Sequence, residues 1–274
     1  MTVAISPTAF TYANQIDYPT ADEAHHLLRV SFDRFMMLIE SLEPEDWGKP
    51  TACTAWDVRA MVAHQAGGYA SGTSYREMFR QYGHIPKKGQ LPEDATNDLQ
   101  ISERANMSPS DLIDELKQVG EKAIHEWAYG FRMVKWIAMP HPVGGFMSFR
   151  DLMWVIHSRD TWMHRLDICR ATGRDFEQTR EHDGRINELV VRDVARKVDG
   201  KLGRRAIRLV LTGTAGGEWI LGSGEPEAEL EMDALDFNIF ASGRFSYKEG
   251  MQRARISGNR ELVETNFKGL LILY

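Results

Sequence analysis

The stretch SFRDLMWVIHSRDTWMHRLDICRATG, residues 148–173, has the pattern of one long capped helix. Ser148 and Asp151 have the spacing of a capping pair, and Gly173 can adopt the left-handed turn that ends a helix. Between them the apolar side chains recur at helical spacing, at Leu152, Val155, Ile156, Met163 and Leu166. The sequence therefore predicts a helix that is largely buried and runs to about Thr172.

Three similar helices are predicted upstream. The first begins at a capping box formed by Thr20 and Glu23, and the third begins at Ser108, with Pro109 at the favoured first helical position. For the second we expect a cap at Thr54, with Asp57 three residues later, and an end at Gly67-Gly68. Four long helices with legible caps are typical of a helix bundle.

Two other regions complete the predicted organisation. Between Arg80 and Met107 several Gly and Pro residues indicate a long crossover loop. Beyond residue 178 short alternating segments predict strands, together with three helices, over residues 186–198, 206–211, 218–221, 228–232, 233–242, 254–256 and 259–271. The predicted fold class is therefore α+β, with a helical domain over residues 1–178 and a small α+β domain over residues 179–274.

Composition excludes several classes of protein. The chain of 274 residues has a net charge of −6 and no dense Lys/Arg block, which argues against a nucleic-acid surface. No apolar run approaches the roughly 20 residues of a membrane span, and the first residues lack the pattern of a signal peptide. With only Cys53 and Cys169, no disulfide framework is expected, so a reducing cytoplasm is the predicted compartment.

The candidate chemistry lies on the helix described first. Asp160 and His164 are four residues apart, so both side chains project from one face and can converge on one point. Burying a carboxylate and an imidazole is expensive unless they are paired or bound to a metal. His64, on a helix otherwise rich in Val, Met and Ala, is the best third ligand. Two His and one carboxylate would leave metal positions open for water or substrate, whereas the simpler alternative is a local hydrogen bond between Asp160 and His164.

Two neighbours of this set have candidate roles. His157 lies one turn before Asp160, where it could be a fourth ligand or a general base, or else a histidine that only supports the ligands or faces solvent. Asp167 lies one turn after His164, and we expect it to pair with Arg165 or with a histidine N–H.

Two motifs carry a resemblance to a known family. Residues 50–64, PTACTAWDVRAMVAH, resemble the P-T-x-C-x-x-W-x-V-x-x-x-x-x-H signature of the mycothiol-dependent maleylpyruvate isomerase family, a branch of the DinB-like metalloenzymes. Residues 160–167, DTWMHRLD, resemble its second signature, an acidic residue ahead of H-R-x-D. Residues 233–237, 242–244 and 256–262 resemble the second domain of that family, which is similar to sterol-carrier folds.

The resemblance implies a DinB-like four-helix bundle with a divalent metal, usually Zn²⁺, on His64, Asp160 and His164. It implies mycothiol as a thiol co-substrate and a small electrophile as the second substrate, in an isomerase or S-transferase reaction. It also implies an Arg from the second domain on the substrate carboxylates. Arg244 is the candidate for that role, and a structural helix-end Arg is the alternative.

The chain departs from the family pattern at two places. The isomerases have Glu where Asp160 stands, and the common Cys-Pro-Gly-Trp is here Cys53-Thr54-Ala55-Trp56. These departures leave both histidines in place but weaken any inference about the substrate. The alternative function is therefore a non-catalytic metal- or ligand-binding protein of the same fold.

Overall fold

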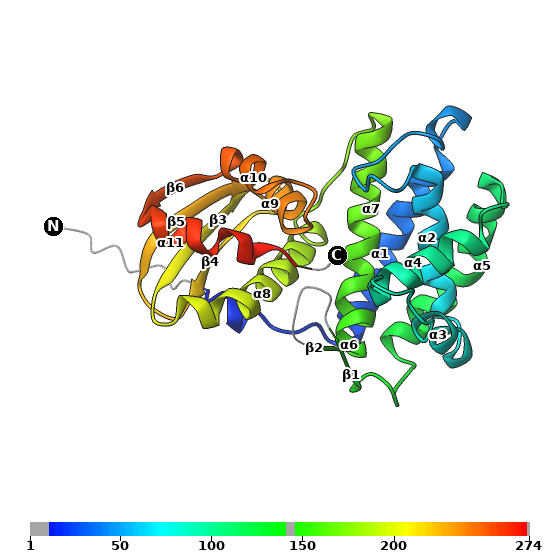
Figure 1. The fold of residues 1–274 in the computed structure, drawn as a ribbon, viewed down its shortest axis with the longest axis horizontal. Helices are drawn as coiled ribbons and strands as arrows, with labels where there is room; N and C mark the ends of the chain where they lie inside the picture. The colour runs from blue at the N-terminus through cyan, green and yellow to red at the C-terminus, as the bar shows by residue number, and fades with distance from the viewer. Residues whose placement is uncertain (1–10, 141–145, 273–274) are drawn as a thin grey trace. The chain divides into compact units, whose positions relative to one another are not determined.

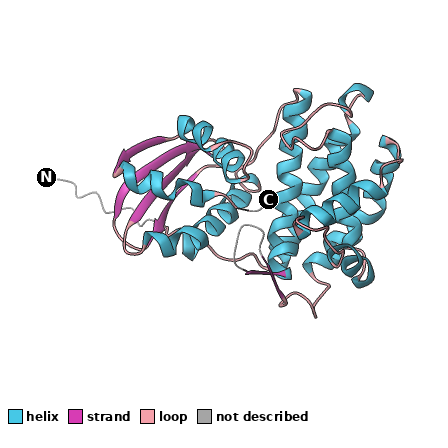
Figure 2. Ribbon diagram, in the orientation of Figure 1, coloured by secondary structure: helices cyan, strands magenta, loops and turns pink. Residues whose placement is uncertain are grey.

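The structure is a computed structural model that describes residues 11–140 and 146–272. These residues form two compact units, a helical unit over Pro19–Glu177 and an α+β unit that combines the residues up to Tyr18 with those from Gln178 onward (Figure 1). Figure 2 shows that, apart from one short pair, the strands belong to the α+β unit. The predicted α+β class, with a helical part followed by a small sheet-containing part, is confirmed.

The four predicted helices are all present in the helical unit, as α1 (Ala21–Glu40), α2 (Val58–Ser71), α5 (Pro109–Ala128) and α7 (His157–Thr172). Here α1 packs on α5 and α7, and α2 packs on α5 and α7. The Thr20 side chain accepts from the Glu23 N–H, and Ser108 forms a reciprocal capping box with the third residue of its helix. Gly173 ends α7 in the left-handed conformation, at φ 74°. These local caps set the ends of three of the four helices as predicted.

The predicted bounds of α2 are wrong at both ends. Asp57, not Thr54, is the cap, because its carboxylate accepts from the Ala60 N–H at 2.7 Å. The helix continues through both predicted stop glycines to Ser71. Gly67 lies where α4 crosses α2, and a Cβ there would come within 2.5 Å of the Gln100 Cβ. This glycine therefore allows close helix packing instead of ending the helix.

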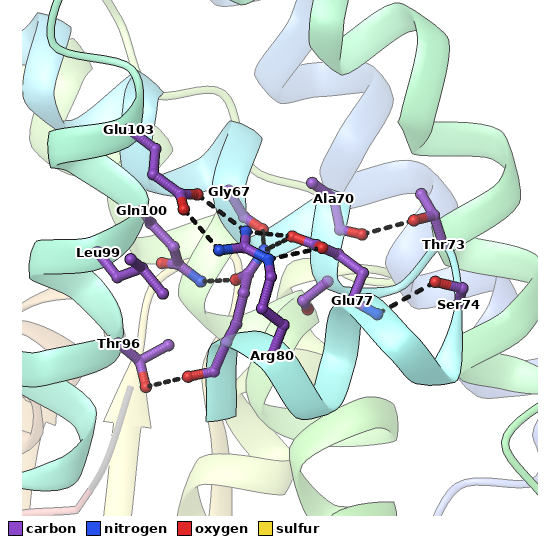
Figure 3. A network of polar contacts seen from close by, with 12 residues as sticks. Gly67, Ala70, Thr73, Ser74, Glu77, Arg80, Thr96, Leu99, Gln100 and Glu103 are labelled. Carbon is purple, nitrogen blue, oxygen red and sulfur yellow. Dashed lines mark hydrogen bonds and ion pairs between the residues drawn. The ribbon is translucent and has the colours of Figure 1, made fainter. Parts of the chain in front are cut away.

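The predicted crossover loop between Arg80 and Met107 is also wrong, since it contains the C-terminal end of α3 (Tyr75–Tyr82) and all of α4 (Pro92–Glu103). Its Gly and Pro residues mark helix ends: Gly83 caps the C-terminus of α3, and Pro92 opens α4. In Figure 3 the Arg80 guanidinium on α3 lies between the carboxylates of Glu77 and Glu103, to which it donates hydrogen bonds. This ion pair ties α3 to α4.

The start of the α7 helix is irregular. Ser148 and Asp151 form the predicted capping box at α6 (Phe149–Asp151), and a π-helical turn, η3 (Leu152–Ile156), then leads into α7. Before it, β1 (Ala138–Pro140) pairs antiparallel with β2 (Phe146–Ser148). Most of the predicted Pro/Gly connector, residues 141–145, lies outside the described residues.

The α+β unit contains a four-stranded sheet of order β4-β3-β5-β6. Strand β3 (Ala206–Thr212) runs antiparallel to β4 (Gly217–Gly222) and parallel to β5 (Pro226–Asp233), which pairs antiparallel with β6 (Arg255–Gly258). The helices of this unit are α8 (Asp183–Leu202), α9 (Ala234–Ala241), α10 (Tyr247–Arg253) and α11 (Arg260–Phe267), with short 3₁₀ turns at η1 (Ala13–Gln15) and η4 (Lys268–Leu270). The predicted strands are found, whereas α10 was not predicted although Ser246 and Glu249 form a capping box at its start.

The beginning of the chain packs with the α+β unit. The Ile220 N–H on β4 donates to the Thr11 carbonyl at 3.0 Å, and Arg185 on α8 donates to the Asp17 carbonyl at 2.9 Å. This differs from the sequence-based division at residue 178, which placed the whole N-terminus in the helical domain. The physical reason is that these residues satisfy their backbone groups on an element contributed by the distant C-terminal part of the chain.

Candidate metal centre

Helices α2 and α7 bring His64, Asp160 and His164 together in the helical unit. One oxygen of the Asp160 carboxylate lies 3.4 Å from His64 Nε2, and the other lies 3.2 Å from His164 Nε2. The centroids of the two imidazole rings are 5.2 Å apart, with the rings nearly perpendicular. Both histidines are buried, and the Asp160 side chain retains 19% of its exposure. The carboxylate is thus held between two imidazoles with one side open.

Gln65 holds Asp160 from the same helix that carries His64. Its Nε2 donates to Asp160 Oδ2 at 2.5 Å, and its Oε1 accepts from the Thr161 hydroxyl at 2.8 Å. The Tyr69 hydroxyl lies 3.1 Å from the same Thr161 oxygen. This buried chain of hydrogen bonds orients the carboxylate.

Asp167 supports His164 from the opposite side of the ring. Its carboxylate lies 3.3 Å from His164 Nδ1 and is buried. Of the two partners expected for Asp167, a histidine N–H is therefore present. The Arg165 guanidinium lies 4.1 Å from the Phe176 ring centroid. A carboxylate on the second nitrogen of an imidazole fixes the tautomer and leaves the first nitrogen available as a ligand.

Trp56 and Cys53 line the same centre. The Trp56 ring lies 4.9 Å from the His64 ring and 5.7 Å from the His164 ring. Cys53 is half-buried, with its Sγ 4.0 Å from an Asp167 carboxylate oxygen. Neither residue was assigned a role from the sequence, although both belong to the motif over residues 50–64. Gln65 was missed as well, and a buried Gln beside His64 in an otherwise apolar helix is the signal that could have found it.

The charges of this cluster are strongly coupled. Burial by itself raises the pKa of Asp160, but His164 and His64 outweigh it and hold that pKa well below the usual range. Burial lowers the pKa of His164, but the negative charges of Asp160 and Asp167 raise it above the ordinary value. The site therefore favours a positive charge beside the Asp160 carboxylate.

The three side chains fit a divalent metal ion. Their ligand atoms lie within 4.8 Å of one another. Ligands about 2.1 Å from a tetrahedral Zn²⁺ are about 3.4 Å apart, which is close to the separations found here. An N–H···O hydrogen bond is typically shorter, at about 2.9 Å. Two imidazoles and one carboxylate are also a donor set that suits zinc and leaves positions open.

His157 lies beside the cluster and not within it. Its ring stacks on Trp127 with the centroids 3.9 Å apart, and its Nε2 lies 3.3 Å from the Tyr82 hydroxyl. Burial lowers the pKa of His157 to about 4, so the ring is neutral at pH 7. Among the described residues it does not belong to a group of converging metal ligands. The geometry thus supports a neighbouring role more than that of a fourth ligand.

Arg244 belongs to the other unit, just after α9. Its side chain is half-buried, and its backbone N–H donates to the Ile239 carbonyl at 3.0 Å. The two arginines that follow have carboxylate partners: Arg253 is 3.5 Å from Asp236, and Arg255 is 3.1 Å from Glu231. The assignment of a substrate-binding role to Arg244 remains a prediction.

Comparisons with known proteins agree with this architecture. The model of the mycothiol maleylpyruvate isomerase N-terminal domain matches residues 28–169, which contain all three candidate ligands. Two crystal structures, of the mycothiol-dependent maleylpyruvate isomerase and of its mutant with one His replaced by Ala, share the fold with a TM-score of 0.57. Each is 14% identical to this chain, and each comparison covers 90% of this chain and 95% of the other. Among curated proteins no match is found.

The described part of the chain has no helix that is both long and apolar enough to cross a membrane.

Proposed function

Because the chain belongs to the mycothiol maleylpyruvate isomerase N-terminal domain family, we propose that it is a metal-dependent enzyme that uses mycothiol to act on a small electrophile. The observation that carries the proposal is the convergence of His64, Asp160 and His164 on one point, with Asp167 behind His164. The reaction class is isomerisation or S-transfer.

His64, Asp160 and His164 would hold the ion, with Zn²⁺ as the best match to the donor set. A bound Zn²⁺ favours the thiolate of a low-molecular-weight thiol over the thiol, which supplies a strong nucleophile at neutral pH. Cys53 is not needed as a nucleophile, because the sulfur comes from the co-substrate.

The protein side chains around the ligands act by positioning. Asp167 holds the His164 ring through Nδ1, so that Nε2 faces Asp160. Gln65 fixes one oxygen of Asp160. Trp56 packs beside both imidazole rings, where it helps to hold them in place. His157 is neutral at pH 7 and so has a free lone pair to accept a proton, and we keep it as the candidate general base, a weak one because its pKa is lowered to about 4.

A thiolate stabilised in this way would support two reactions. It could add reversibly to an activated C=C bond, which would allow rotation before elimination returned the same thiolate. In an S-transfer it would form a new C–S bond while a leaving group departed with its electron pair. Both need a cationic partner for the electrophile, and we propose that Arg244 supplies it, because a guanidinium forms two parallel hydrogen bonds with a carboxylate.

The first experiment measures metal. The purified protein should carry about one divalent ion per chain, determined by mass spectrometry, and both His64→Ala and His164→Ala should lose it. His84→Ala, at an exposed loop position, is the matched control and should keep the ion. Retention of the ion in both site variants would refute the ligand set.

The second experiment measures activity with the metal content held constant. Mycothiol-dependent consumption of maleylpyruvate, and of a model electrophile with a leaving group, distinguishes isomerase from S-transferase. Arg244→Gln should raise KM for a carboxylate substrate without changing metal content, and Arg204→Gln, another arginine of the same unit, serves as the control. A protein that binds the ion but consumes neither substrate with any thiol would instead be a non-catalytic binding protein of the same fold.

A further inference from the structure

A cavity of about 460 Å³ lies in the helical unit, where α1 begins and α5 ends. Its walls are formed by Ala21, Ala128, Tyr129, Arg132, Lys135, Trp136 and Trp154. None of the residues of the candidate metal centre belongs to these walls. The volume is within the range of sites for small molecules, about 300–1,000 Å³.

Lys135 is the central charged group of this cavity. Its side chain is 93% buried, because only 7% of its surface is exposed, and its Nζ donates to the Ala128 carbonyl at 2.7 Å. The same ammonium group lies 4.9 Å from the Trp154 ring centroid. Burial, together with the like charges of Arg132 and Arg150, lowers the pKa of Lys135 to about 8, against a smaller opposing effect of Glu126. An anion in the cavity would relieve this repulsion.

Positive charge and aromatic surface are interleaved around Lys135. The Arg150 guanidinium lies 4.3 Å from the Trp136 ring centroid and 5.6 Å from that of Trp154. The Arg150 backbone N–H donates to the Lys135 carbonyl at 2.9 Å, which fixes the two cationic residues relative to each other. Among the described residues that form the cavity walls, none carries a carboxylate.

The walls are held in place by buried contacts. The Trp154 indole N–H donates to the Trp127 carbonyl at 2.9 Å. The segment that carries Arg132 and Lys135 begins at Phe131, whose φ of 47° is the one positive value among the described non-glycine residues. Its ring is buried and meets the Tyr75 ring edge-on at 4.8 Å. A bulky residue in this conformation is strained, and such strain persists where the surroundings enforce it, often at ligand sites.

We propose that this cavity is a second ligand site, separate from the metal centre, and that it binds a small carboxylate with an aromatic ring. Lys135 and Arg132 bind the carboxylate, and the ring packs against Trp154, Trp136 and Tyr129. An aromatic carboxylate fits better than inorganic phosphate, because phosphate would make no apolar contact with the aromatic walls and would lose more of its hydration.

The test measures binding to the full-length, metal-loaded protein by calorimetry, with benzoate, acetate and inorganic phosphate as probes. Benzoate should bind at least tenfold more tightly than acetate or phosphate. Lys135→Met keeps the apolar stem but removes the charge, and Arg132→Gln removes the charge of an exposed residue. Each should weaken benzoate binding tenfold or more. Lys122→Gln removes one positive charge from the exposed face of α5 and should leave benzoate binding unchanged.

Three results would overturn the proposal. The first is benzoate affinity that is the same in Arg132→Gln as in the wild type. The second is phosphate or acetate bound as tightly as benzoate, which would show that the aromatic walls are not used. The third is loss of benzoate binding in His164→Ala, which would place the carboxylate on the metal centre.

Discussion

Two adjacent glycines of α2 provide a sharp test of how the helical unit is packed. Gly67 and Gly68 are consecutive residues of one helix, yet a methyl group would meet very different surroundings at each. At Gly67 the added Cβ would lie 2.5 Å from both Cβ and Cγ of Gln100 and 3.0 Å from an Arg104 nitrogen. At Gly68 nothing lies within 4 Å. Replacing each glycine by alanine therefore distinguishes the effect of helix propensity, which both variants share, from the effect of the packing of α4 on α2, which only Gly67→Ala disturbs.

The magnitudes follow from this geometry. Replacing Gly by Ala inside a helix stabilises it by about 0.5–1 kcal/mol, and both variants receive that gain. Only in Gly67→Ala does the added methyl group clash with Gln100. The clash is with side-chain atoms close to the Gln100 backbone, and overpacking of this kind costs about 1–3 kcal/mol. The free energies of unfolding of the two variants should therefore differ by about 1–3 kcal/mol, with Gly68→Ala the more stable.

Thermal unfolding followed by far-UV circular dichroism measures this difference, because the helical unit dominates the signal at 222 nm. For a domain of this size each kcal/mol corresponds to about 2–4 °C, so the two Tm values should differ by about 2–12 °C. Metal content, measured in parallel, shows whether displacement of α4 reaches His64 one turn earlier on α2. Equal Tm shifts of the same sign in the two variants would show that α4 does not pack closely against Gly67.

Three further predictions concern single carboxylates. Asp160→Glu should retain more metal by mass spectrometry than Asp160→Ala, because it keeps a carboxylate ligand; equal loss would exclude Asp160 as a ligand or show a pocket rigid to within one methylene. Asp167→Asn should lower metal affinity by about 10–100-fold in a chelator competition, and unchanged affinity would show that its contact with His164 is incidental. A hydrogen bond from Lys49 lowers the pKa of Asp46 from 3.8 to about 2; burial opposes this shift, and Arg174 adds to it. The stability that Asp46 contributes should thus be complete above about pH 4 and lost as the pH falls through about 2, so that Asp46→Asn loses less stability than the wild type in acid unfolding; parallel curves would contradict this.

Local sequence signals predicted the helices well wherever the deciding interaction spans only a few residues. Caps such as those at Thr20 and Ser108 involve a side chain and a backbone group three residues apart, so the sequence alone contains both partners. The same holds for Asp160 and His164, whose shared helix face follows from helical spacing. The strands of the α+β unit were likewise visible from their alternation.

Sequence reasoning failed where the same residue type serves two purposes. Gly67 and Gly83 look alike as helix breakers, yet Gly83 ends α3 whereas Gly67 lies inside α2 beneath Gln100. Only the position of α4 distinguishes them. The Gly and Pro residues between Arg80 and Met107 predicted a loop that includes Pro92, although a proline at the first position of a helix needs no hydrogen-bond donor.

Interactions between residues close in the chain specify the caps, the amphipathic helices and the pair of candidate ligands on α7. Tertiary structure decided which residues complete the centre: His64 reaches Asp160 across 96 positions of the chain, and Gln65 reaches it across 95. It also decided that Asp167 lies against His164 Nδ1 and that the Arg165 guanidinium packs on the Phe176 ring. Contacts between distant segments depend on how whole helices pack, and that packing minimises the free energy of the entire core, which no short stretch of sequence encodes.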